Sequence, residues 1–366
     1  MSSIVFSVLI VSSIGAALAT LLVFAERYIT NYGECEISIN EGKKIRLQGG
    51  SSLLDALTRQ KIFIPSACGG RGSCGYCKLK VVEGAGPVLP TEEPYLSPEE
   101  RGKGVRLSCQ VKIRNDLRIE IPPELLSVSE YECVCTDIQD LTYDIKQFRF
   151  GLKEPSRIDF IPGQYVQVLT PEYEDNPEEV YRAYSISSDP SEKGFIELIV
   201  RLVPNGICTT YLFGNIQVGD PVRINGPYGQ FRLTDTEAPI VFIAGASGMA
   251  PIKCMLHHMV KTENKRKATY FFGVNTLKDL FLAEEMKIFE SRLPGFRFVP
   301  VVASPEEGPG WAGEIGLVTQ ALERFSTDLV DHEAYLCGSP GMIDASIEVL
   351  RKHGIPLEHI FYDKFS

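Results

Sequence analysis

The sequence predicts a multidomain chain with α+β and α/β parts behind an N-terminal transmembrane helix. Three observations support this organisation: an uncharged apolar run opens the chain, short alternating β-segments fill its middle, and strand, turn and helix patterns alternate over its last third. At 366 residues the chain is long enough for two or three domains with separate cores. We therefore expect the parts to span residues 4–25, 33–127, 131–235 and 238–366.

The composition is that of an acidic globular protein. Its formal net charge is −10, and the sequence contains no basic run of the kind that follows a phosphate backbone. The five histidines show neither metal spacing nor a triad. Ten unevenly clustered cysteines in a chain of this size favour thiolate ligation in a reducing compartment over a disulfide framework. We therefore expect neither nucleic-acid binding nor hydrolytic catalysis.

The apolar run Ile4–Ala25 contains 22 residues and no charge. At about 1.5 Å per residue, a helix of this length crosses about 30 Å of hydrocarbon. A signal peptide is the alternative, because residues 17–19 (Ala-Leu-Ala) resemble a cleavage site, but no basic region precedes the run, which continues beyond that site. Arg27, Lys43 and Lys44 follow the run, so the positive-inside rule predicts a single-pass protein with cytoplasmic catalytic domains.

A small mixed unit of strands and helix is predicted next. "ECEISIN" and "KKIRLQ" alternate as two strands across a turn at Glu41-Gly42, and "SSLLDALTRQ" follows as an amphipathic helix with a serine cap. "CKLKVVEG" and "DLRIEIPP" supply two further strands. We interpret Pro122-Pro123 and the polar "ELLSVSEYE" as the linker to the next domain.

A glycine-rich stretch in this unit, "ACGGRGSCGYC", contains Cys68, Cys74 and Cys77, and Cys109 follows in "RLSCQ". Glycine adopts positive φ at little cost, so the stretch can turn sharply and direct amide groups at bound sulfur. Three thiolates on one loop and a fourth further along are typical of a plant-type [2Fe–2S] ferredoxin, here with one extra residue in the first gap. A structural zinc site, the alternative, usually shows two CxxC pairs. The pattern predicts a [2Fe–2S] cluster on these four cysteines.

The remaining two domains differ in their periodicity. Six β-segments from "YECVCTDI" to "DPVRINGPYG" are separated by turn signals, which predicts an antiparallel barrel. From Ala238 the pattern becomes buried strand, tight turn and helix, as in "PIVFIAGASGMAPIKCMLHHMV", with later strands in "ATYFFGV", "FRFVPVVA" and "AYLCGSP". This alternation predicts an open parallel sheet of Rossmann type.

The barrel segment "RAYSISS" places Arg182, Tyr184 and Ser185 on one strand, and RxYS is similar to the flavin signature of the ferredoxin-NAD(P)+ reductase superfamily. By this resemblance, Arg182 pairs with the FAD pyrophosphate, Tyr184 packs on the isoalloxazine ring and Ser185 hydrogen-bonds near flavin N5. "NGICTTYL" places Gly206 and Thr209 at a helix start, where N–H groups attract the FAD phosphates.

The turn "AGASGMAP" lies between a buried strand and a helix. The small residues Gly245, Ser247 and Gly248 would let a dinucleotide pyrophosphate approach the backbone, and Pro251 follows them, although the pattern is not GxGxxG. In its position after RxYS, the turn resembles the nicotinamide-nucleotide site of the same superfamily. "LCGSPGM" resembles that superfamily's CGxPxM motif, whose cysteine, here Cys337, lies near the nicotinamide. A buried strand thiol is the alternative for Cys337.

The C-terminal stretch "FYDKFS" places Phe365 where the superfamily has an aromatic that covers the flavin face; simple packing beside the last strand is the alternative. Ser185, Cys337 and Phe365 are thus the residues expected at the reacting centre. The turn Val274-Asn275-Thr276 contains no arginine for a 2′-phosphate, which favours NADH over NADPH, although Lys278 lies close by in the sequence.

The apolar segment followed by "ACGGRGSCGYCKLKVVEGAG", "LPTEE" and "GVRLSCQV" closely resembles the F subunit of the bacterial Na+-translocating NADH:quinone oxidoreductase, and the resemblance continues to the C-terminus. A proline-rich insertion of that family is missing between "IVRLV" and "NGICTTYL". The resemblance implies a β-grasp ferredoxin domain, an FAD barrel, an NAD domain, partner subunits and the bacterial inner membrane.

The three modules in one chain predict an order of electron transfer. NADH gives up two electrons together and an iron–sulfur cluster accepts one, and FAD can connect the two, so the expected order is NADH, FAD, [2Fe–2S] cluster and membrane partner. Two alternatives remain open. The chain could be a reductase component that serves an oxygenase or another acceptor, or a zinc-stapled nucleotide-binding scaffold without turnover.

Overall fold

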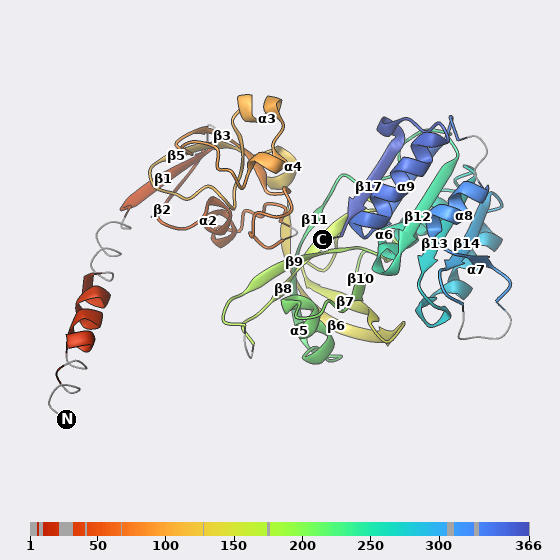
Figure 1. Ribbon diagram of the computed structural model, residues 1–366, viewed down its shortest axis with the longest axis horizontal. Helices are drawn as coiled ribbons and strands as arrows, with labels where there is room; N and C mark the ends of the chain where they lie inside the picture. The colour runs from red at the N-terminus through yellow and green to blue at the C-terminus, as the bar shows by residue number, and fades with distance from the viewer. Residues whose placement is uncertain are drawn as a thin grey trace. The chain divides into compact units, whose positions relative to one another are not determined.

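The computed structural model describes residues 6, 10–21, 32–40, 42–66, 68–126, 128–173, 176–305, 311–325 and 329–365 (Figure 1). Residues 10–21 form a helix. Among the described residues, none of the helices combines the length and the apolar character needed to cross a bilayer. The predicted membrane segment Ile4–Ala25 lies partly outside the described residues.

Two compact units make up the chain. The N-terminal unit ends at residue 127, and the C-terminal unit comprises residues 128–366 together with residues 67–69. The N-terminal unit contains a sheet of five strands in the order β2-β1-β5-β3-β4. Its elements are β1 (Glu34–Ile39), β2 (Lys43–Gln48), α2 (Leu53–Arg59), β3 (Lys78–Glu83), η1 (Glu93–Tyr95), α3 (Pro98–Gly102), β4 (Val105–Leu107), β5 (Leu117–Glu120) and α4 (Pro123–Leu126).

The sheet of the N-terminal unit is mixed, because β1 pairs parallel with β5 and the other pairs are antiparallel. The predicted hairpin, helix and two later strands are confirmed. Ser52 caps α2 as expected, and its side chain accepts a hydrogen bond from the Asp55 amide. Leu53 and Leu57 of α2 are fully buried with Ile37 of β1, so the helix packs its apolar face on the sheet.

The stretch interpreted as a linker is partly regular structure, so that interpretation was wrong in detail. Residues 123–126 form α4, and β6 (Ser129–Asp140) begins within "ELLSVSEYE". Tyr131 and Cys133 point into a core, whereas Glu132 is exposed between them. The alternating pattern of β6 was hard to recognise in the sequence, because polar residues stand on both sides of Tyr131, its first buried side chain.

The C-terminal unit begins with an antiparallel sheet of six strands in the order β10-β7-β6-β11-β8-β9. A bridge between Ile186 and Leu198 joins the chain after β9 to β10, so the sheet curls back on itself as the predicted barrel requires. The further elements are β7 (Ile145–Glu154), β8 (Tyr165–Thr170), β9 (Val180–Ser185), β10 (Phe195–Arg201), α5 (Ile207–Gly214) and β11 (Pro221–Tyr228).

A parallel sheet of six strands follows, in the order β15-β14-β13-β12-β16-β17. Its strands are β12 (Ile240–Gly245), β13 (Ala268–Val274), β14 (Phe296–Val302), β15 (Glu314–Ile315), β16 (Glu333–Gly338) and β17 (Ile360–Lys364). The connecting elements are η2 (Ala246–Gly248), α6 (Met249–Lys261), η3 (Leu277–Asp279), α7 (Ala283–Arg292), α8 (Val318–Phe325), α9 (Pro340–Lys352) and η4 (Leu357–His359).

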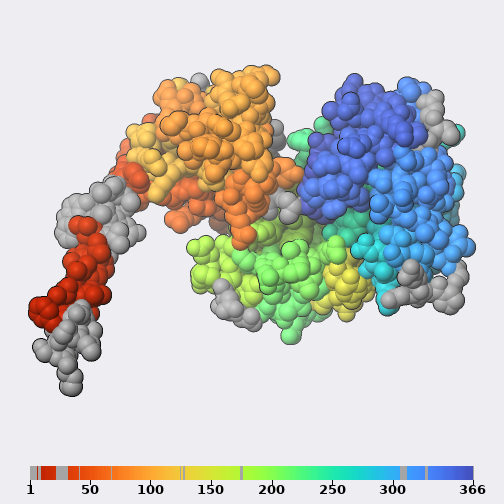
Figure 2. Space-filling model, viewed as in Figure 1, coloured from red at the N-terminus to blue at the C-terminus, as the bar shows by residue number. Residues whose placement is uncertain are grey.

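The predicted open parallel sheet is confirmed, and helices cover both of its faces. Phe242 of β12 packs in a core with α6 and α7, whereas Val241 and Ile243 pack in a second core with α8 and α9. Burial on both faces explains why this strand is a continuous apolar run in the sequence. The first core also contains Ile145 and Ile199 of the antiparallel sheet. The two sheets of the C-terminal unit therefore form one body, seen as adjoining yellow-green and cyan-blue surfaces in Figure 2.

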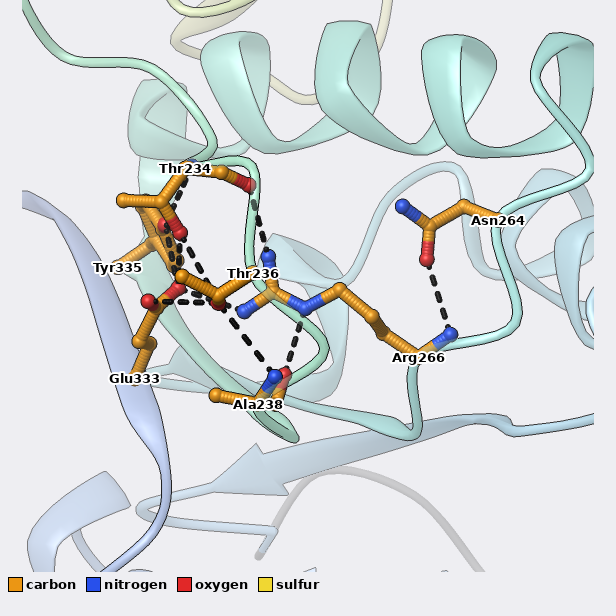
Figure 3. Close-up of polar contacts among 7 residues, drawn as sticks. All are labelled: Thr234, Thr236, Ala238, Asn264, Arg266, Glu333 and Tyr335. Carbon is orange, nitrogen blue, oxygen red and sulfur yellow. Dashed lines mark hydrogen bonds and ion pairs between the residues drawn. The ribbon is translucent and has the colours of Figure 1, made fainter.

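A buried ion pair fixes the connector between β11 and β12 (Figure 3). Arg266 Nη2 lies 2.6 Å from Glu333 Oε2, and both side chains are almost fully buried. The guanidinium also donates to the carbonyls of Thr234 and Ala238, while the hydroxyls of Thr234 and Thr236 donate to the Glu333 carboxylate. Burial alone would raise the pKa of Glu333, but these donors outweigh it and hold the pKa below its usual value.

Candidate functional site

Four glycines shape the cysteine-rich loop. Gly69, Gly70, Gly72 and Gly75 have φ of +63°, +85°, +74° and +73°. A residue with a Cβ is strained in this left-handed region, whereas glycine adopts it at little cost. The loop therefore reverses direction repeatedly, as the sequence predicted for a backbone that wraps around a bound group.

Two of the four predicted cysteine ligands come into direct contact. Cys77 precedes β3 and Cys109 follows β4, and their Sγ atoms lie 3.3 Å apart. The Ser108 amide donates to the Cys77 carbonyl at 2.8 Å and so joins the two segments. Cys68 and Cys74 are half-buried on the glycine loop. Within the described part of the chain, no three His, Cys, Asp or Glu side chains are grouped as ligands of a single metal ion.

The residues around these cysteines fit a bound iron–sulfur cluster. Four thiols form the donor set that a [2Fe–2S] cluster uses. The Ser108 hydroxyl, next to Cys109, is fully buried and has no hydrogen-bond partner among the described atoms. A buried hydroxyl without a partner costs about 1–3 kcal/mol, and a cluster sulfur beside Cys109 would offer it an acceptor.

A buried ion pair that sequence reasoning missed supports the strand leading to Cys109. Arg106 of β4 is bonded to Glu92 at 2.5 Å, and it also donates to the Gly86 and Pro87 carbonyls. Glu92 is fully buried and accepts a hydrogen bond from the Leu107 amide. Burial would raise the pKa of Glu92, but Arg106 and the backbone donors outweigh it and lower the pKa. The signal in the sequence was an arginine between two apolar residues of the strand, and its partner Glu92 lies 14 residues earlier, within "LPTEE".

The RxYS residues lie on β9. Arg182 and Tyr184 share one face because side chains alternate along a strand, and Ser185 points to the other side and is buried. Arg182 Nη1 donates to the Tyr181 carbonyl at 2.9 Å. Tyr184 packs against the core of the antiparallel sheet beside Cys208, and burial raises the pKa of its phenol far above the usual value. A neutral phenol at this position can pack against a ring.

Gly206 and Thr209 lie where the helix-start prediction placed them. Gly206 is the N-cap residue of α5, and Thr209 is in the first turn. The Thr209 hydroxyl accepts from the Val203 amide at 3.2 Å and so closes the loop that precedes the helix. The Thr209 side chain thus fixes the loop that leads into α5. The first backbone N–H groups of a helix have no partner within the helix and can donate to a ligand.

The nucleotide-type turn lies at the carboxyl edge of the parallel sheet. The strand order reverses between β12 and β16, and such a switch point is where open α/β sheets bind ligands. A Cβ built on Gly248 would lie 2.2 Å from the Cys337 carbonyl oxygen, so the turn and β16 are in close contact. Gly245 ends β12, Ser247 is half-buried in η2, and Pro251 is buried in the first turn of α6.

Cys337 and Phe365 meet at the same edge of the sheet. Cys337 pairs with Ala244 across β16 and β12, and burial raises the pKa of its thiol well above the usual value. The Phe365 amide donates to the Gly338 carbonyl at 2.9 Å, and the ring packs against the core that includes Cys337. The structure thus brings together Gly248, Cys337 and Phe365.

Sequence reasoning also missed Lys253, a buried lysine on α6. Its ammonium group lies 3.1 Å from Gln147 and 3.4 Å from both Glu197 and Glu285. The signal was available, since "APIKCML" places one charge inside an apolar helix, and a buried charge is rare unless it is paired.

Three family models match consecutive parts of the chain. They describe a 2Fe-2S iron-sulfur cluster binding domain at residues 38–114, an oxidoreductase FAD-binding domain at residues 132–233 and an oxidoreductase NAD-binding domain at residues 242–347. The first match falls in the N-terminal unit, the second on the antiparallel sheet of the C-terminal unit and the third on its parallel sheet.

Relatives match the chain from end to end. The F subunit of the Na(+)-translocating NADH-quinone reductase of Neisseria gonorrhoeae is 33% identical over 404 aligned positions, which cover 99% of each chain. The protein of the same name from Histophilus somni is 34% identical over 393 positions, which cover 95% of this chain and 96% of that protein.

Two solved structures have a similar fold. The Amycolatopsis cytochrome P450 reductase GcoB has a TM-score of 0.72 and 28% identity, covering 90% of this chain and 98% of that chain. The ferredoxin reductase in carbazole 1,9a-dioxygenase has a TM-score of 0.70 and 26% identity, covering 91% and 99%. Both cover nearly the whole of the two units described above.

Proposed function

The chain belongs to the family of F subunits of the Na(+)-translocating NADH-quinone reductase, and from this premise we propose that it is the electron-input subunit of a membrane-bound quinone reductase. It is an NADH oxidoreductase with the order NADH, FAD, [2Fe–2S] cluster. The observation that carries the proposal is the succession of cluster, FAD and NAD domains in a chain that matches these relatives from end to end.

Cys68, Cys74, Cys77 and Cys109 would hold the cluster in this proposal. The contact between Cys77 and Cys109 and the left-handed glycines of the loop support the assignment. The Arg106–Glu92 pair would keep the strand before Cys109 in place, since a buried pair resists displacement of either partner.

The flavin would lie against β9. Arg182 would neutralise the pyrophosphate, Tyr184 would stack on the isoalloxazine ring, and Ser185 would donate a hydrogen bond near N5. The backbone at Gly206 and Thr209 would add N–H donors for the phosphates. When bound, FAD supplies the conversion between a hydride donor and a one-electron acceptor.

The nicotinamide nucleotide would bind at the switch point of the parallel sheet. Gly245, Ser247 and Gly248 would face the pyrophosphate, and Pro251 would fix the first turn of α6. Cys337 would line the nicotinamide pocket as a neutral thiol, because burial raises its pKa. Phe365 would cover the flavin until nicotinamide displaces it. The turn after β13 contains no arginine for a 2′-phosphate, which supports NADH rather than NADPH.

We place the anchor at Ile4–Ala25, as a single-pass helix of the bacterial inner membrane with the other domains in the cytoplasm. The domains would span residues 33–127, 131–235 and 238–366. Transfer of electrons to quinone and coupling to sodium require other membrane subunits, since the name of the relatives describes one subunit of a larger enzyme.

A reductase that serves an oxygenase is the second candidate. The likeness to a cytochrome P450 reductase and to a dioxygenase's ferredoxin reductase favours it. The first candidate has the stronger support, because identity to an F subunit of the quinone reductase reaches 33% over 99% of the chain. Deletion of the gene separates the two candidates. Loss of NADH-dependent quinone reduction in membranes supports the first, and loss of an oxygenase activity supports the second.

The proposed order of transfer is tested by removing the cluster alone. We expect Cys74→Ala to lose the iron and to retain NADH-dependent reduction of ferricyanide through FAD. Cys35→Ala is the matched control, because Cys35 lies in the same unit but outside the loop, and it should retain the cluster. Loss of FAD from the Cys74 variant, or full transfer to the membrane partner without a cluster, would contradict the proposal.

A further inference from the structure

A buried lysine connects the two domains of the C-terminal unit. Lys253 of α6 is only 3% exposed. Its Nζ lies 3.1 Å from Gln147 Oε1 on β7 and 3.4 Å from Glu197 Oε2 on β10. A third acceptor, Glu285 Oε1 on α7, lies at 3.4 Å within the parallel-sheet domain. The ammonium group thus bonds to two antiparallel strands and one helix of its own domain.

Glu197 is held firmly on the side of the antiparallel sheet. Arg149 donates to its Oε1 from Nε at 3.0 Å and from Nη2 at 2.7 Å. Burial would raise the pKa of Glu197, but the charge of Lys253 and the bonds from Arg149 outweigh it and lower the pKa. The carboxylate is therefore ionised at neutral pH, and each of its oxygens faces a different cation.

Short connections lead from this ion pair to both sides of the proposed hydride transfer. The Glu197 carbonyl accepts from the Ser187 amide at 2.8 Å, and Ser187 is two residues beyond Ser185. Lys253 lies on the second turn of α6, which begins directly after Gly248. Gly248 itself packs against the backbone of Cys337. The turn that contains Gly248 also lies close to β10.

Apolar contacts alone would not fix the relative position and orientation of the antiparallel-sheet and parallel-sheet domains. Met255 approaches the Gly163 loop, and Cys254 packs in the core of the antiparallel sheet. Dispersion and hydrophobic contacts are non-directional, whereas a charged hydrogen-bonded group has a preferred geometry. A water-accessible cleft of about 310 Å³ lies beside Lys253 and Glu197, so the domains are not fully packed together there.

We infer that Lys253 is a positioning residue for hydride transfer, which holds the nicotinamide-binding turn at a fixed distance from the flavin-binding strand through Glu197 and Gln147. The inference rests on the proposed function. In that step a hydride, with two electrons and one hydrogen nucleus, passes from NADH to FAD and leaves NAD+. The reacting atoms must approach to about 3–3.5 Å, and a displacement of about 1 Å costs on the order of 100-fold in rate.

The test is anaerobic stopped-flow reduction of the flavin by NADH in the full-length holoprotein. We expect Lys253→Met, which replaces the four-carbon stem of the lysine with an unbranched apolar chain of the same number of heavy atoms and removes the ammonium group, to slow flavin reduction by about 10- to 100-fold. The affinity for NADH in the preceding binding phase, the FAD content and the iron content should stay within twofold of wild type. NADH deuterated at C4 should slow the step in both proteins, which identifies it as hydride transfer.

Glu285→Gln is the matched control. It removes a partner at the same 3.4 Å distance that does not cross between the domains, so its rate should stay within twofold of wild type. Lys253→Arg, which keeps the charge, should recover most of the rate. A purely structural role would instead lower the melting temperature of the Lys253→Met protein and leave its rate of flavin reduction unchanged.

The outcomes separate the inference from the proposed function. Wild-type holoprotein that NADH does not reduce would overturn the proposed function. Wild type that is reduced normally, with Lys253→Met within twofold of it, would overturn the positioning role alone. If Lys253→Met does not fold, Gln147→Leu removes the uncharged acceptor on β7 and should slow flavin reduction two- to fivefold; an unchanged rate would then count against the inference.

Discussion

Buried carboxylates paired with basic side chains recur at the residue scale. Glu92, Glu197 and Glu333 are 0%, 6% and 4% exposed, and each contacts a lysine or arginine. Removal of one partner from such a pair leaves an uncompensated charge, which typically costs about 3–5 kcal/mol. These three residues are therefore positions at which a single substitution has large and separable effects.

Glu92→Gln should destabilise the N-terminal unit by about 3 kcal/mol at pH 7. The pKa of Glu92 is lowered in the folded state, so its contribution to stability is present above the usual carboxyl pKa and is lost as pH falls through the folded value. The free energy of unfolding, measured in urea by cluster absorbance, should fall less steeply with decreasing pH in the variant than in the wild type. The exposed Glu99→Gln is the control, and equal pH dependence in all three proteins would refute the assignment.

Phe365→Ala should tighten nicotinamide binding by up to about tenfold. An aromatic pair is worth about 0.5–1.5 kcal/mol, and about 1.4 kcal/mol corresponds to one decade in affinity. If Phe365 covers the flavin, nicotinamide must displace it, so loss of the ring removes that competition. Anaerobic titration with NAD+ and NADH measures the effect. Unchanged affinity and turnover with a lower melting temperature would assign Phe365 to packing against the core around Cys337.

At the scale of elements, the turn between β12 and α6 depends on close packing against β16. A Cβ on Gly248 would lie 2.2 Å from the Cys337 carbonyl oxygen, although φ at this residue is an ordinary −61°. A backbone carbonyl cannot move aside as a flexible side chain can. The turn therefore has to shift when this glycine is replaced, and the nucleotide site shifts with it.

Gly248→Ala should weaken NADH binding by at least about tenfold, which is about 1.4 kcal/mol, with FAD and iron content unchanged. Gly341→Ala on α9 is the control, since a Cβ there meets no atom within 4 Å. Titration of both variants with NADH, followed by flavin absorbance, gives the comparison. Equal affinities for the two proteins would remove the turn from the nucleotide site.

The sequence predicted the elements that have a strong local signal. The alternation in β1 and β2, the continuous apolar run of β12 and the glycines at positive φ each follow from one stretch of chain. The three-residue strand β4 and the start of β6 were missed, because so short a strand or so polar a start shows little periodicity.

The contacts that join distant parts of the chain were beyond sequence reasoning. Lys253 meets Glu197 from 56 residues away, and Arg266 meets Glu333 from 67 residues away. A lone charge in an apolar stretch signals a buried partner but does not identify it. Cys68, Cys74 and Cys77, and likewise the RxYS residues, could be recognised because their spacing is local, whereas the positions of their supporting residues are set by the tertiary fold.

At the scale of the whole molecule, the apolar N-terminal segment and the redox domains are proposed to have separate tasks. Deletion of residues 1–26 should release an enzyme that still reduces ferricyanide with NADH but no longer supports quinone reduction in membranes. In this proposal the anchor would keep the cluster near its acceptor and would contribute no reacting group. Quinone reduction at the full rate by the truncated chain added to membranes would refute this division of tasks.

The central claim is that one chain conducts electrons from NADH through FAD to a [2Fe–2S] cluster. It is tested most directly by anaerobic titration of the purified full-length protein with NADH, followed by visible absorbance and electron paramagnetic resonance. The account predicts about two iron atoms and one FAD per chain, bleaching of the flavin, and a reduced [2Fe–2S] signal that approaches one spin per chain. Zinc in place of iron, or a fully reduced flavin without any cluster signal, would contradict it.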